Sequence, residues 1–583
     1  MAKGDTTMVR QTAPGVRPAA ASVTKRMSGA RALIECLDRV GVEVMFGHPG
    51  GAALPLYDAL YDARQIRHVL VRHEQVAAHA AVGYHRVTGK VGVCMATSGP
   101  GATNLLTGIT DAMMDSAGIV AITGQVSTLA IGTDAFQEAD VMGMTMPITK
   151  HNCLVQTATD LPRIVLQCFL IAATGRPGPV LVDIPRDIAQ TETEFEFPEQ
   201  VTLRSGKVPP AVPSPNQIAA AAALLSQASR PIVYAGGGII SSNAAPELTA
   251  FACKARIPVT TTLMGKGGFP ETDPLSLGML GMHGTAYANF AINAADIILA
   301  VGVRFDDRVT GRLKDFAPQA RFIHIDIDPA EIGKNKPAHV PIVGDAREAL
   351  RVLAAQVTPP ECEAWHRQIA EWKERHPLRY RQEGDTIKPQ FAIDAIYRAT
   401  KGQAIVVTDV GQHQMWAAQF YLSTQPRTWV TSGGLGAMGF GFPAALGAQM
   451  GRPDALVCAI VGDGGFQMTL QDLATAVEWG LPIKIYVINN KCLGMVRQWQ
   501  QLFYRERYSH VMLQNPDFAK LAEAFGAVGI AVRRPEEVAP AIERSLEVTD
   551  GPCLVDVHCD PGENCYPMIP SGQSIKEMII EGM

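Results

Sequence analysis

Several features common in other protein classes are missing from this sequence of 583 residues. No apolar run reaches the roughly 18 residues that span a membrane. Charged residues make up only 18%, and the net charge of −5 argues against the broad basic surface of a nucleic-acid-binding protein. The 11 cysteines include no CxxC pair, so neither a zinc site nor a disulfide framework is expected. We therefore expect a cytoplasmic protein with no membrane and no nucleic-acid partner.

The composition is that of a globular protein with ample material for a core. Hydrophobic residues make up 47% of the chain. At about 150 residues per domain, its length predicts three or four domains. Residues 1–27 are rich in Ala, Pro, Thr and Arg, and they lack the apolar segment of a secretory signal. We expect a disordered N-terminal tail there, with an organelle-targeting peptide as the second interpretation.

Strands and helices alternate along most of the remaining sequence. This order is typical of α/β domains with doubly wound parallel sheets. Two stretches interrupt it: residues 191–215 are acidic and then proline-rich, and residues 357–388 are rich in Pro, Glu and Arg. We therefore predict domains at 28–190, 216–356 and 389–583, joined by these two linkers. The similar style of the first and third domains suggests a duplication.

The sequence GDGG at 462–465 joins two predicted strands through a helix. An apolar strand, 455–461, precedes it, apolar residues recur at i, i+3, i+4 and i+7 over 470–477, and a second apolar strand ends before Asn490. Asp463 and Asn490 should then lie at the carboxyl ends of neighbouring parallel strands, where open α/β sheets bind ligands. A carboxylate and an amide oxygen suit Mg²⁺ with a bound diphosphate. The alternative is a tight turn with an N-capping Asp463.

Glu74 stands at another junction of a strand with a helix. Residues 69–71 form a short predicted strand, and an Ala-rich helix covers 76–84. One interpretation is a solvated carboxylate favoured by the helix dipole, and the other is a carboxylate that acts on a bound cofactor.

A long loop is predicted in the same domain. The stretch from 124 to 140 is rich in polar residues and too long for a simple connection. Long loops in compact domains are usually functional, so we expect a functional loop here.

Glycines mark two further candidate ligand sites. The middle domain has glycines at a strand end, 236–238, and Asp326 in a later strand, which together can bind the phosphates and ribose of a nucleotide. GLGAMG at 434–439 matches GxGxxG, but no acidic residue follows at the expected distance. We therefore predict close backbone packing near a cofactor at 434–439. No GxxxxGK[ST] phosphate loop occurs.

From about Met27 onward the sequence resembles the acetohydroxyacid synthase (acetolactate synthase) family of thiamine-diphosphate enzymes. The pair GDG and NN marks only the superfamily, whereas RFDDRVTG, IGTDAFQEAD and MVRQWQQ mark this branch. The matching stretches are GHPGGA at 47–52, TSGPGATN at 97–104, IGTDAFQEAD at 131–140, RPGPVLVDIP at 176–185, RFDDRVTG at 304–311, GLGAMGFG at 434–441, GDGGFQM at 462–468 and NNKCLGMVRQWQQ at 489–501.

The resemblance implies three α/β domains that bind the pyrimidine of thiamine diphosphate, FAD, and the diphosphate with Mg²⁺, in that order. It implies an enzyme that decarboxylates pyruvate and transfers the hydroxyethyl group to a second 2-ketoacid. The product would be 2-acetolactate or 2-aceto-2-hydroxybutyrate, in branched-chain amino-acid biosynthesis. The implied partners are a second copy of the chain, in a homodimer or a tetramer, and a small regulatory subunit. A flavin-dependent pyruvate oxidase on the same scaffold is the alternative function, and an inactive scaffold protein is a further one.

The resemblance also implies roles for single residues. Glu74 would activate the aminopyrimidine across a dimer interface, Met438 would support the bent cofactor, and Gln137 would stabilise oxyanions. Arg308 would pair with the carboxylate of the second ketoacid. Trp499 would favour the extra methylene of 2-ketobutyrate. The structural alternatives are an ion pair of Arg308 with a neighbouring aspartate and a place for Trp499 in the core.

The remaining contacts are assigned by the same resemblance. Further substrate contacts would be Phe136 and Gly51. Mg²⁺ would bind Asp463, Asn490 and the backbone carbonyl of Cys492. Thiamine diphosphate would also contact Gly436, Gly462, Gly464, Gly465 and Met495. FAD, without net redox chemistry, would contact Arg176, Gly237, Thr262, Leu263, Met264, His283, Arg304, Asp326 and Asp345. The sequence departs from the family at Arg186, where many relatives carry Lys, and at Ser127, where plant relatives often carry Pro.

Overall fold

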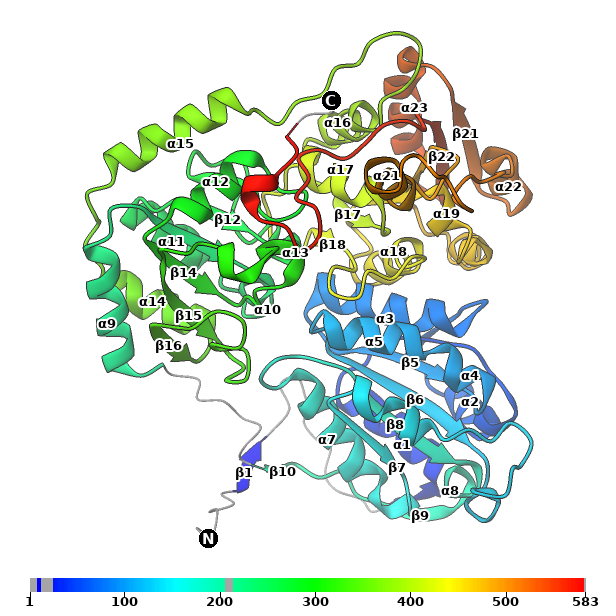
Figure 1. Ribbon diagram of the computed structural model, residues 1–583. Helices are drawn as coiled ribbons and strands as arrows, with labels where there is room; N and C mark the ends of the chain where they lie inside the picture. Colours follow the sequence, from blue (N-terminus) through cyan, green and yellow to red (C-terminus); the bar gives the residue numbers. More distant parts are fainter. Residues whose placement is uncertain (1–7, 12–24, 205–212, 581–583) are drawn as a thin grey trace.

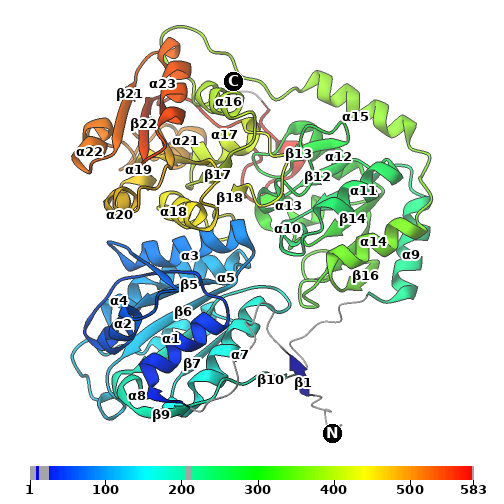
Figure 2. The same ribbon diagram turned by 180° about the vertical axis from the view of Figure 1, so that it is seen from behind.

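The structure is a computed structural model that describes residues 8–11, 25–204 and 213–580. Its core is built from three sheets of six strands each, and every neighbouring pair of strands within them is parallel. Helices surround each sheet, and the three domains lie side by side (Figures 1 and 2). The predicted α/β fold with three doubly wound parallel sheets is confirmed. Within the described residues, no helix is long and apolar enough to cross a membrane.

The first sheet has the strand order β4-β3-β5-β6-β8-β7. Its strands are β3 (Val44–Gly47), β4 (Arg67–Leu70), β5 (Gly92–Ala96), β6 (Ile119–Gln125), β7 (His151–Leu154) and β8 (Val180–Pro185). Its helices are α1 (Gly29–Arg39), α2 (Leu54–Tyr61), α3 (Glu74–Thr88), α4 (Pro100–Asn104), α5 (Leu106–Met114), α6 (Val141–Thr145), α7 (Leu161–Ala173) and α8 (Arg186–Gln190). Ser28 is the N-cap of α1, and its side chain accepts a hydrogen bond from the Arg31 amide, as is common for serine at this position.

The central sheet has the order β13-β12-β11-β14-β15-β16. Its strands are β11 (Pro231–Ala235), β12 (Val259–Thr261), β13 (Ser276–Met279), β14 (Ile297–Val301), β15 (Arg321–Asp326) and β16 (Val340–Val343). Its helices are α9 (Pro215–Ser226), α10 (Gly237–Ser241), α11 (Ala245–Ala255), α12 (Ala286–Ala294), α13 (Asp307–Thr310) and α14 (Ala346–Gln356). In chain order this is 3-2-1-4-5-6, the order of dinucleotide-binding sheets, in which ligands bind beyond the carboxyl ends where the order reverses.

The third sheet has the order β18-β17-β19-β20-β22-β21. Its strands are β17 (Ile405–Thr408), β18 (Trp429–Val430), β19 (Val457–Gly462), β20 (Lys484–Asn489), β21 (Val528–Val532) and β22 (Cys553–His558). Its helices are α16 (Pro389–Thr400), α17 (Gln412–Phe420), α18 (Gly441–Gly451), α19 (Asp463–Phe466), α20 (Leu473–Glu478), α21 (Gly494–Phe503), α22 (Phe518–Ala524) and α23 (Pro535–Glu547). Counted along the chain, the first and third sheets share the order 2-1-3-4-6-5, which supports a duplication.

Each outer sheet is buried on both faces. In β19, Ala459 packs into one hydrophobic cluster, and Cys458 and Ile460 pack into another on the opposite face. The first of these clusters continues without a break into the first domain, where it includes Val76 and Ala80 of α3. Helices α3 and α18 form this contact between the outer domains (Figure 1).

Some segments differ from the sequence-based prediction. In the predicted linker 191–215, β9 (Glu192–Phe195) pairs antiparallel with β2 (Lys25–Ser28). A second pair, β1 (Met8–Gln11) with β10 (Val201–Arg204), joins the predicted tail to the same linker. The structure thus places short strands in part of the expected disordered tail and in part of the expected linker, and the sequence did not indicate them because each strand needs a partner far away in the chain. The rest of the predicted tail, residues 1–7 and 12–24, lies outside the described residues.

One further helix agrees with a sequence-based alternative, since residues 357–385 were expected to be mostly helical or linker, and another helix differs from its prediction. The predicted linker 357–388 contains α15 (Glu363–Arg375), whose buried Trp365 and Ile369 pack on the central domain. The helix expected over 470–477 begins instead as a 3-10 turn, Leu470–Asp472, and only then continues as α20.

Candidate active site

A cavity of about 960 Å³ lies where the three domains meet. The first domain contributes Arg176, the central domain contributes Gly237, and the third domain contributes Asp463 to its lining. All nine residues predicted to contact FAD line it. So do the predicted diphosphate, magnesium and ketoacid residues of the central and third domains, which are Arg308, Gly436, Met438, Gly462, Asp463, Gly464, Gly465, Asn490, Cys492, Met495 and Trp499. The fold thus gathers residues from distant parts of the sequence around one space.

Asp463 lies at the third-domain end of this cavity. β19 and β20 are parallel neighbours, as predicted, so Asp463 and Asn490 follow adjacent strand ends. The Asp463 side chain is buried, and it accepts hydrogen bonds from Asn515 Nδ2 at 2.6 Å and from the Gly464 amide at 3.0 Å. Burial raises the pKa of Asp463 to about 6. Since a bound cation would offset this desolvation, the site fits a positive ligand.

The second oxygen donor comes from Asn490. Its Oδ1 accepts a hydrogen bond from the Cys492 amide at 3.3 Å, and its Nδ2 donates to Gln412 Oε1 at 3.2 Å. Within the described residues, no group of three or more His, Cys, Asp or Glu side chains is placed to hold a metal. A cation here would therefore rely on amide and backbone oxygens beside Asp463, which is a donor set suited to Mg²⁺.

Glycines keep the same end of the cavity open. A side chain at Gly464 would approach Leu493 to 2.9 Å and Met438 to 3.6 Å. Gly436 has a φ of +71°, in the left-handed region that favours glycine. A diphosphate can approach the backbone only where such side chains are missing, so the glycines fit a phosphate cradle.

Asp409 supports the turn that carries Met438. Its carboxylate is buried and accepts hydrogen bonds from the amides of Gly439 at 3.0 Å and Gly441 at 2.9 Å. Burial raises the pKa of Asp409 to about 6. Asp409 is not among the residues that the sequence analysis assigned to the site.

The central domain supplies unsatisfied polar groups to the cavity. Nε2 of His283 is buried without a hydrogen-bond partner among the described residues, and Nδ1 of the same ring lies 3.2 Å from the Pro567 carbonyl. Arg176 pairs with Glu331 at 2.8 Å, and burial raises the pKa of Asp326 to about 7. Since buried polar atoms normally have partners, His283 fits a site that a polar ligand completes.

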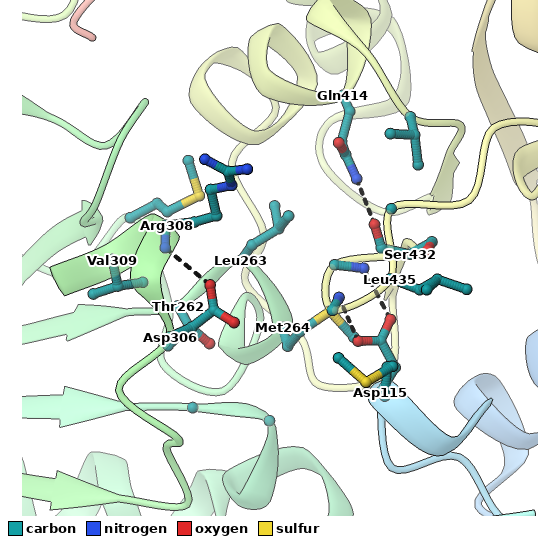
Figure 3. Close-up of a pocket in the computed structure, with 18 of the residues that line it drawn as sticks. Asp115, Thr262, Leu263, Met264, Asp306, Arg308, Val309, Gln414, Ser432 and Leu435 are labelled. Atoms are coloured by element: carbon teal, nitrogen blue, oxygen red, sulfur yellow. Dashed lines mark hydrogen bonds between the residues drawn. The ribbon is translucent and has the colours of Figure 1, made fainter. Parts of the chain in front are cut away.

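Arg308 and Trp499 line the cavity from different domains. The Arg308 amide donates to Asp306 at 3.0 Å (Figure 3), and its guanidinium donates to Ser571 Oγ at 3.1 Å. Its contact with Asp307 is 3.9 Å long and exposed, so the alternative of a structural ion pair has little support. Trp499 is only partly buried, against Phe503, which does not favour the core alternative.

Four predicted residues of the first domain do not line this cavity in the described chain: Gly51, Glu74, Phe136 and Gln137. Glu74 begins α3, is buried, and accepts a hydrogen bond from Asn104 Nδ2 at 2.9 Å. Phe136 is 88% exposed, and Gln137 has a φ of +61°, which is uncommon for a residue other than glycine. One chain alone therefore does not bring the predicted Glu74 to the predicted cofactor end.

The sequence matches models of three thiamine pyrophosphate enzyme domains. They are the N-terminal TPP binding domain at residues 27–144, the central domain at 218–353 and the C-terminal TPP binding domain at 409–557. These ranges fall on the three sheets in order.

Curated relatives are similar over nearly the whole chain. An acetolactate synthase large subunit from Corynebacterium glutamicum is 52% identical over 94% of this chain and 90% of its own length. A large subunit from Haemophilus influenzae is 46% identical, covering 95% of this chain and 98% of the relative. A chloroplastic acetolactate synthase from Oryza sativa is 48% identical, covering 95% and 88%.

The chain belongs to the acetolactate synthase family. Membership in this family of thiamine-pyrophosphate-dependent carboligases supports the predicted synthase and not the pyruvate oxidase alternative.

In this acetolactate synthase fold, several residues around the cavity were missed by the sequence analysis. Asn515 orients Asp463 and also donates to Asn489 at 2.9 Å. Gln412 connects Asn490 with Gln498 of α21. Asp115 of the first domain reaches the loop that carries Gly436 and Met438. No local pattern marks these residues, because each acts on a segment far away along the chain.

Proposed function

We propose that this chain is the catalytic subunit of an acetolactate synthase. It decarboxylates pyruvate and joins the remaining two-carbon unit to a second 2-ketoacid, forming 2-acetolactate or 2-aceto-2-hydroxybutyrate for branched-chain amino-acid synthesis. One observation carries the proposal. Asp463 and Asn490 follow adjacent strand ends, and they line the same cavity as the edge of the central sheet whose strand order is that of dinucleotide-binding sheets. The full-length similarity to acetolactate synthases supports it.

Thiamine diphosphate, when bound, supplies the electron sink that decarboxylation of a 2-ketoacid needs. Asp463, Asn490 and the Cys492 carbonyl would hold Mg²⁺, and the glycines at 436, 462, 464 and 465 would admit the diphosphate. Met438 and Met495 line the same space and would support the rings of the cofactor. The chain itself would bind and orient the cofactor and the substrates, and it would exclude water from them.

Glu74 would hold and move a proton on the pyrimidine side of the cofactor, and Gln137 would donate to oxyanions there. Because neither lines the cavity of its own chain, the proposal includes a homodimer, or a tetramer built from two dimers, in which each subunit completes its partner's site. Gly51 and Phe136 would reach the substrate from the same side. The name of the bacterial relatives, large subunit, supports a small regulatory partner as well.

Substrate selection would fall to the central and third domains. Arg308 presents an exposed guanidinium at the cavity, suited to the carboxylate of the second ketoacid. Trp499 would contact its alkyl group, and one added methylene is worth about 1–3 kcal/mol in such a pocket. FAD would occupy the central-domain side, beside Arg176, His283 and Asp326, without a net redox role.

The proposal includes the three domains at 28–190, 216–356 and 389–583. A reducing, cytoplasmic location is also part of it, because all 11 cysteines are free thiols.

An anaerobic assay with thiamine diphosphate, Mg²⁺, FAD and pyruvate tests the function. Acetolactate should form while the flavin absorbance stays that of the oxidised form. Bleached flavin together with acetate would overturn the proposal in favour of an oxidase. If neither product forms, with or without the small subunit, the proposal also fails.

A further inference from the structure

The first domain holds the loop at 432–439 of the third domain through the end of one helix. Asp115 directly follows α5, and its carboxylate accepts hydrogen bonds from the amides of Gly433 at 2.8 Å and Gly434 at 2.6 Å. Figure 3 shows the Asp115 side chain beneath this loop, between the first domain and Met264 of the central domain. Asp115 is buried, so water does not compete for these bonds.

A second carboxyl group holds the same loop one helical turn earlier. Asp111 accepts a hydrogen bond from Ser432 Oγ, which in turn accepts one from the Ala437 amide at 2.9 Å. Three backbone amides and one hydroxyl of the loop are therefore fixed directly or indirectly by α5 and the residue after it. Successive amides that converge on one carboxylate form a stable anion-binding turn.

The loop lacks regular structure of its own between β18 and α18. From the third domain it is held by Gln414, which donates to the Ser432 carbonyl at 2.9 Å (Figure 3), and by Asp409 at Gly439. Between these ends, Gly436 and Met438 line the cavity. Contacts from Asp115 thus fix the stretch directly before the residues that face the cofactor.

The charge around Asp115 favours a carboxylate there. The Arg86 guanidinium lies 4.0 Å from Asp115 Oδ2 and also donates to the Asp115 backbone carbonyl. Burial and the neighbouring carboxylate of Asp115 raise the pKa of Asp111 to about 8. Burial also raises the pKa of Asp115, although the Arg86 guanidinium and the amides of Gly433 and Gly434 lower it in part. The Asp115 carboxylate accepts from two amides beside Arg86, whereas one oxygen of Asp111 has no partner among the described residues, so the geometry favours a proton on Asp111 rather than on Asp115.

We propose that Asp115 is a positioning residue for catalysis: from the first domain it holds the loop at 432–439 so that Gly436 and Met438 meet thiamine diphosphate in the active conformation. The expected effect on the reaction rests on the proposed function, whereas the positioning of the loop by Asp115 does not. The cofactor site is then completed only when the first and third domains are docked, because the carboxylate and the loop belong to different domains.

Asp115→Asn tests this inference. The amide matches the carboxylate in shape, yet either orientation turns an NH₂ group toward the Gly433 or the Gly434 amide. Asp62→Asn is the matched control, because it makes the same chemical change at an exposed aspartate of the first domain that pairs only with Arg31 in the contacts described. For the wild type and each variant, amide hydrogen exchange is measured over residues 431–440 of the full-length protein without cofactor. The dissociation constant for thiamine diphosphate with Mg²⁺ is then measured by calorimetry.

In Asp115→Asn, exchange of this loop should be about tenfold faster, while exchange of α18 is unchanged. The dissociation constant should rise by about tenfold, and kcat for acetolactate formation should fall by about 10–100-fold with KM for pyruvate changed less than about twofold. Asp62→Asn should stay within about twofold of the wild type in loop exchange, in the dissociation constant and in kcat. Wild-type exchange and affinity in Asp115→Asn, or an equal loss in Asp62→Asn, would overturn the inference.

Ser432→Ala provides a second variant in case Asp115→Asn does not fold. It removes the hydrogen bond to Asp111 and the acceptor for the Ala437 amide, and it leaves the buried pair of Arg86 and Asp115 unchanged. Loop exchange should again be faster, and unchanged exchange would contradict the inference. Because exchange is measured without cofactor or substrate, its result stands apart from any failure of the proposed function, which would appear as an inactive wild type.

Discussion

Gly447 of α18 lies directly against the backbone carbonyl of Ala80 in α3, and a side chain at Gly447 would collide with that oxygen. Gly83 meets Ala444 in the same way from the opposite helix. The first and third domains therefore dock through two helices whose backbones approach as closely as glycine permits. This contact packs α18 against α3, the helix that begins at Glu74.

Replacing Gly447 by Ala should separate the two helices. Overpacking a buried contact costs about 1–3 kcal/mol, so the free energy of unfolding in urea should fall by that amount. Gly551→Ala is the control, because no atom lies within 4 Å of a side chain at that position, and it should change stability by less than about 0.5 kcal/mol. Equal stability of the two variants would show that the helices can move apart freely.

Lys266 and Glu271 form a buried ion pair within the central domain, and both side chains also bond to the third domain. Lys266 donates to both oxygens of Glu271, at 2.7 and 2.6 Å, and to the Ala418 carbonyl at 2.9 Å. Lys266→Met leaves a buried carboxylate without its cation, so unfolding should become about 3–5 kcal/mol easier. Replacing Glu271 by Leu as well should restore much of the loss. Arg351→Ala, which breaks an exposed pair with Glu348, should change stability by less than about 0.5 kcal/mol in the same urea experiment.

The stability of the folded protein should depend on pH through Asp111. Its pKa is raised from an ordinary value of 3.8 to about 8 in the folded chain, chiefly by burial. An acid with a raised pKa stabilises the fold below its unfolded pKa and loses this contribution as pH rises through the folded value. Between pH 5 and pH 8 the Tm of Asp111→Asn should therefore rise relative to that of the wild type. A constant difference in Tm across this range would show that Asp111 is already ionised.

Asn515 should control metal binding although it is not a predicted ligand. It donates to the Asp463 oxygen at 2.6 Å and so fixes the carboxylate that would bind Mg²⁺. Asn515→Ala should weaken Mg²⁺-dependent binding of thiamine diphosphate by about 10–100-fold in a calorimetric titration. The exposed neighbour Gln514 serves as the control, and Gln514→Ala should bind as the wild type does. Full affinity in Asn515→Ala would mean that Asp463 needs no support.

Glu74→Gln should separate catalysis from cofactor binding. If Glu74 moves a proton on the cofactor, acetolactate formation should fall by about 10²–10⁴-fold while thiamine diphosphate still binds. Glu43→Gln, which removes an exposed partner of Lys90 in the same domain, should keep full activity. Activity within about twofold of wild type in Glu74→Gln would instead support the solvated carboxylate at a helix start.

Much of the fold could be predicted from local pattern. The apolar strands that became β19 and β20, and the helix start at Glu74, were expected within a few residues, because hydrophobic periodicity and turn residues act over short distances. The strand β9 was missed, since an edge strand of four residues is defined by its partner and not by its own sequence. The candidate active-site residues of the third domain were chosen through motifs, and their shared cavity follows from adjacent parallel strands.

The sequence by itself determined the type of domain, the family and the chemical groups available at 462–465 and 489–490. Only the tertiary structure decided which of those groups meet. Asp115 and Gly434 are 319 residues apart, and their contact depends on the docking of two domains. The same docking leaves Glu74 outside the cavity of its own chain. Local propensity cannot encode such relationships, because they arise from the packing of whole sheets and helices against one another.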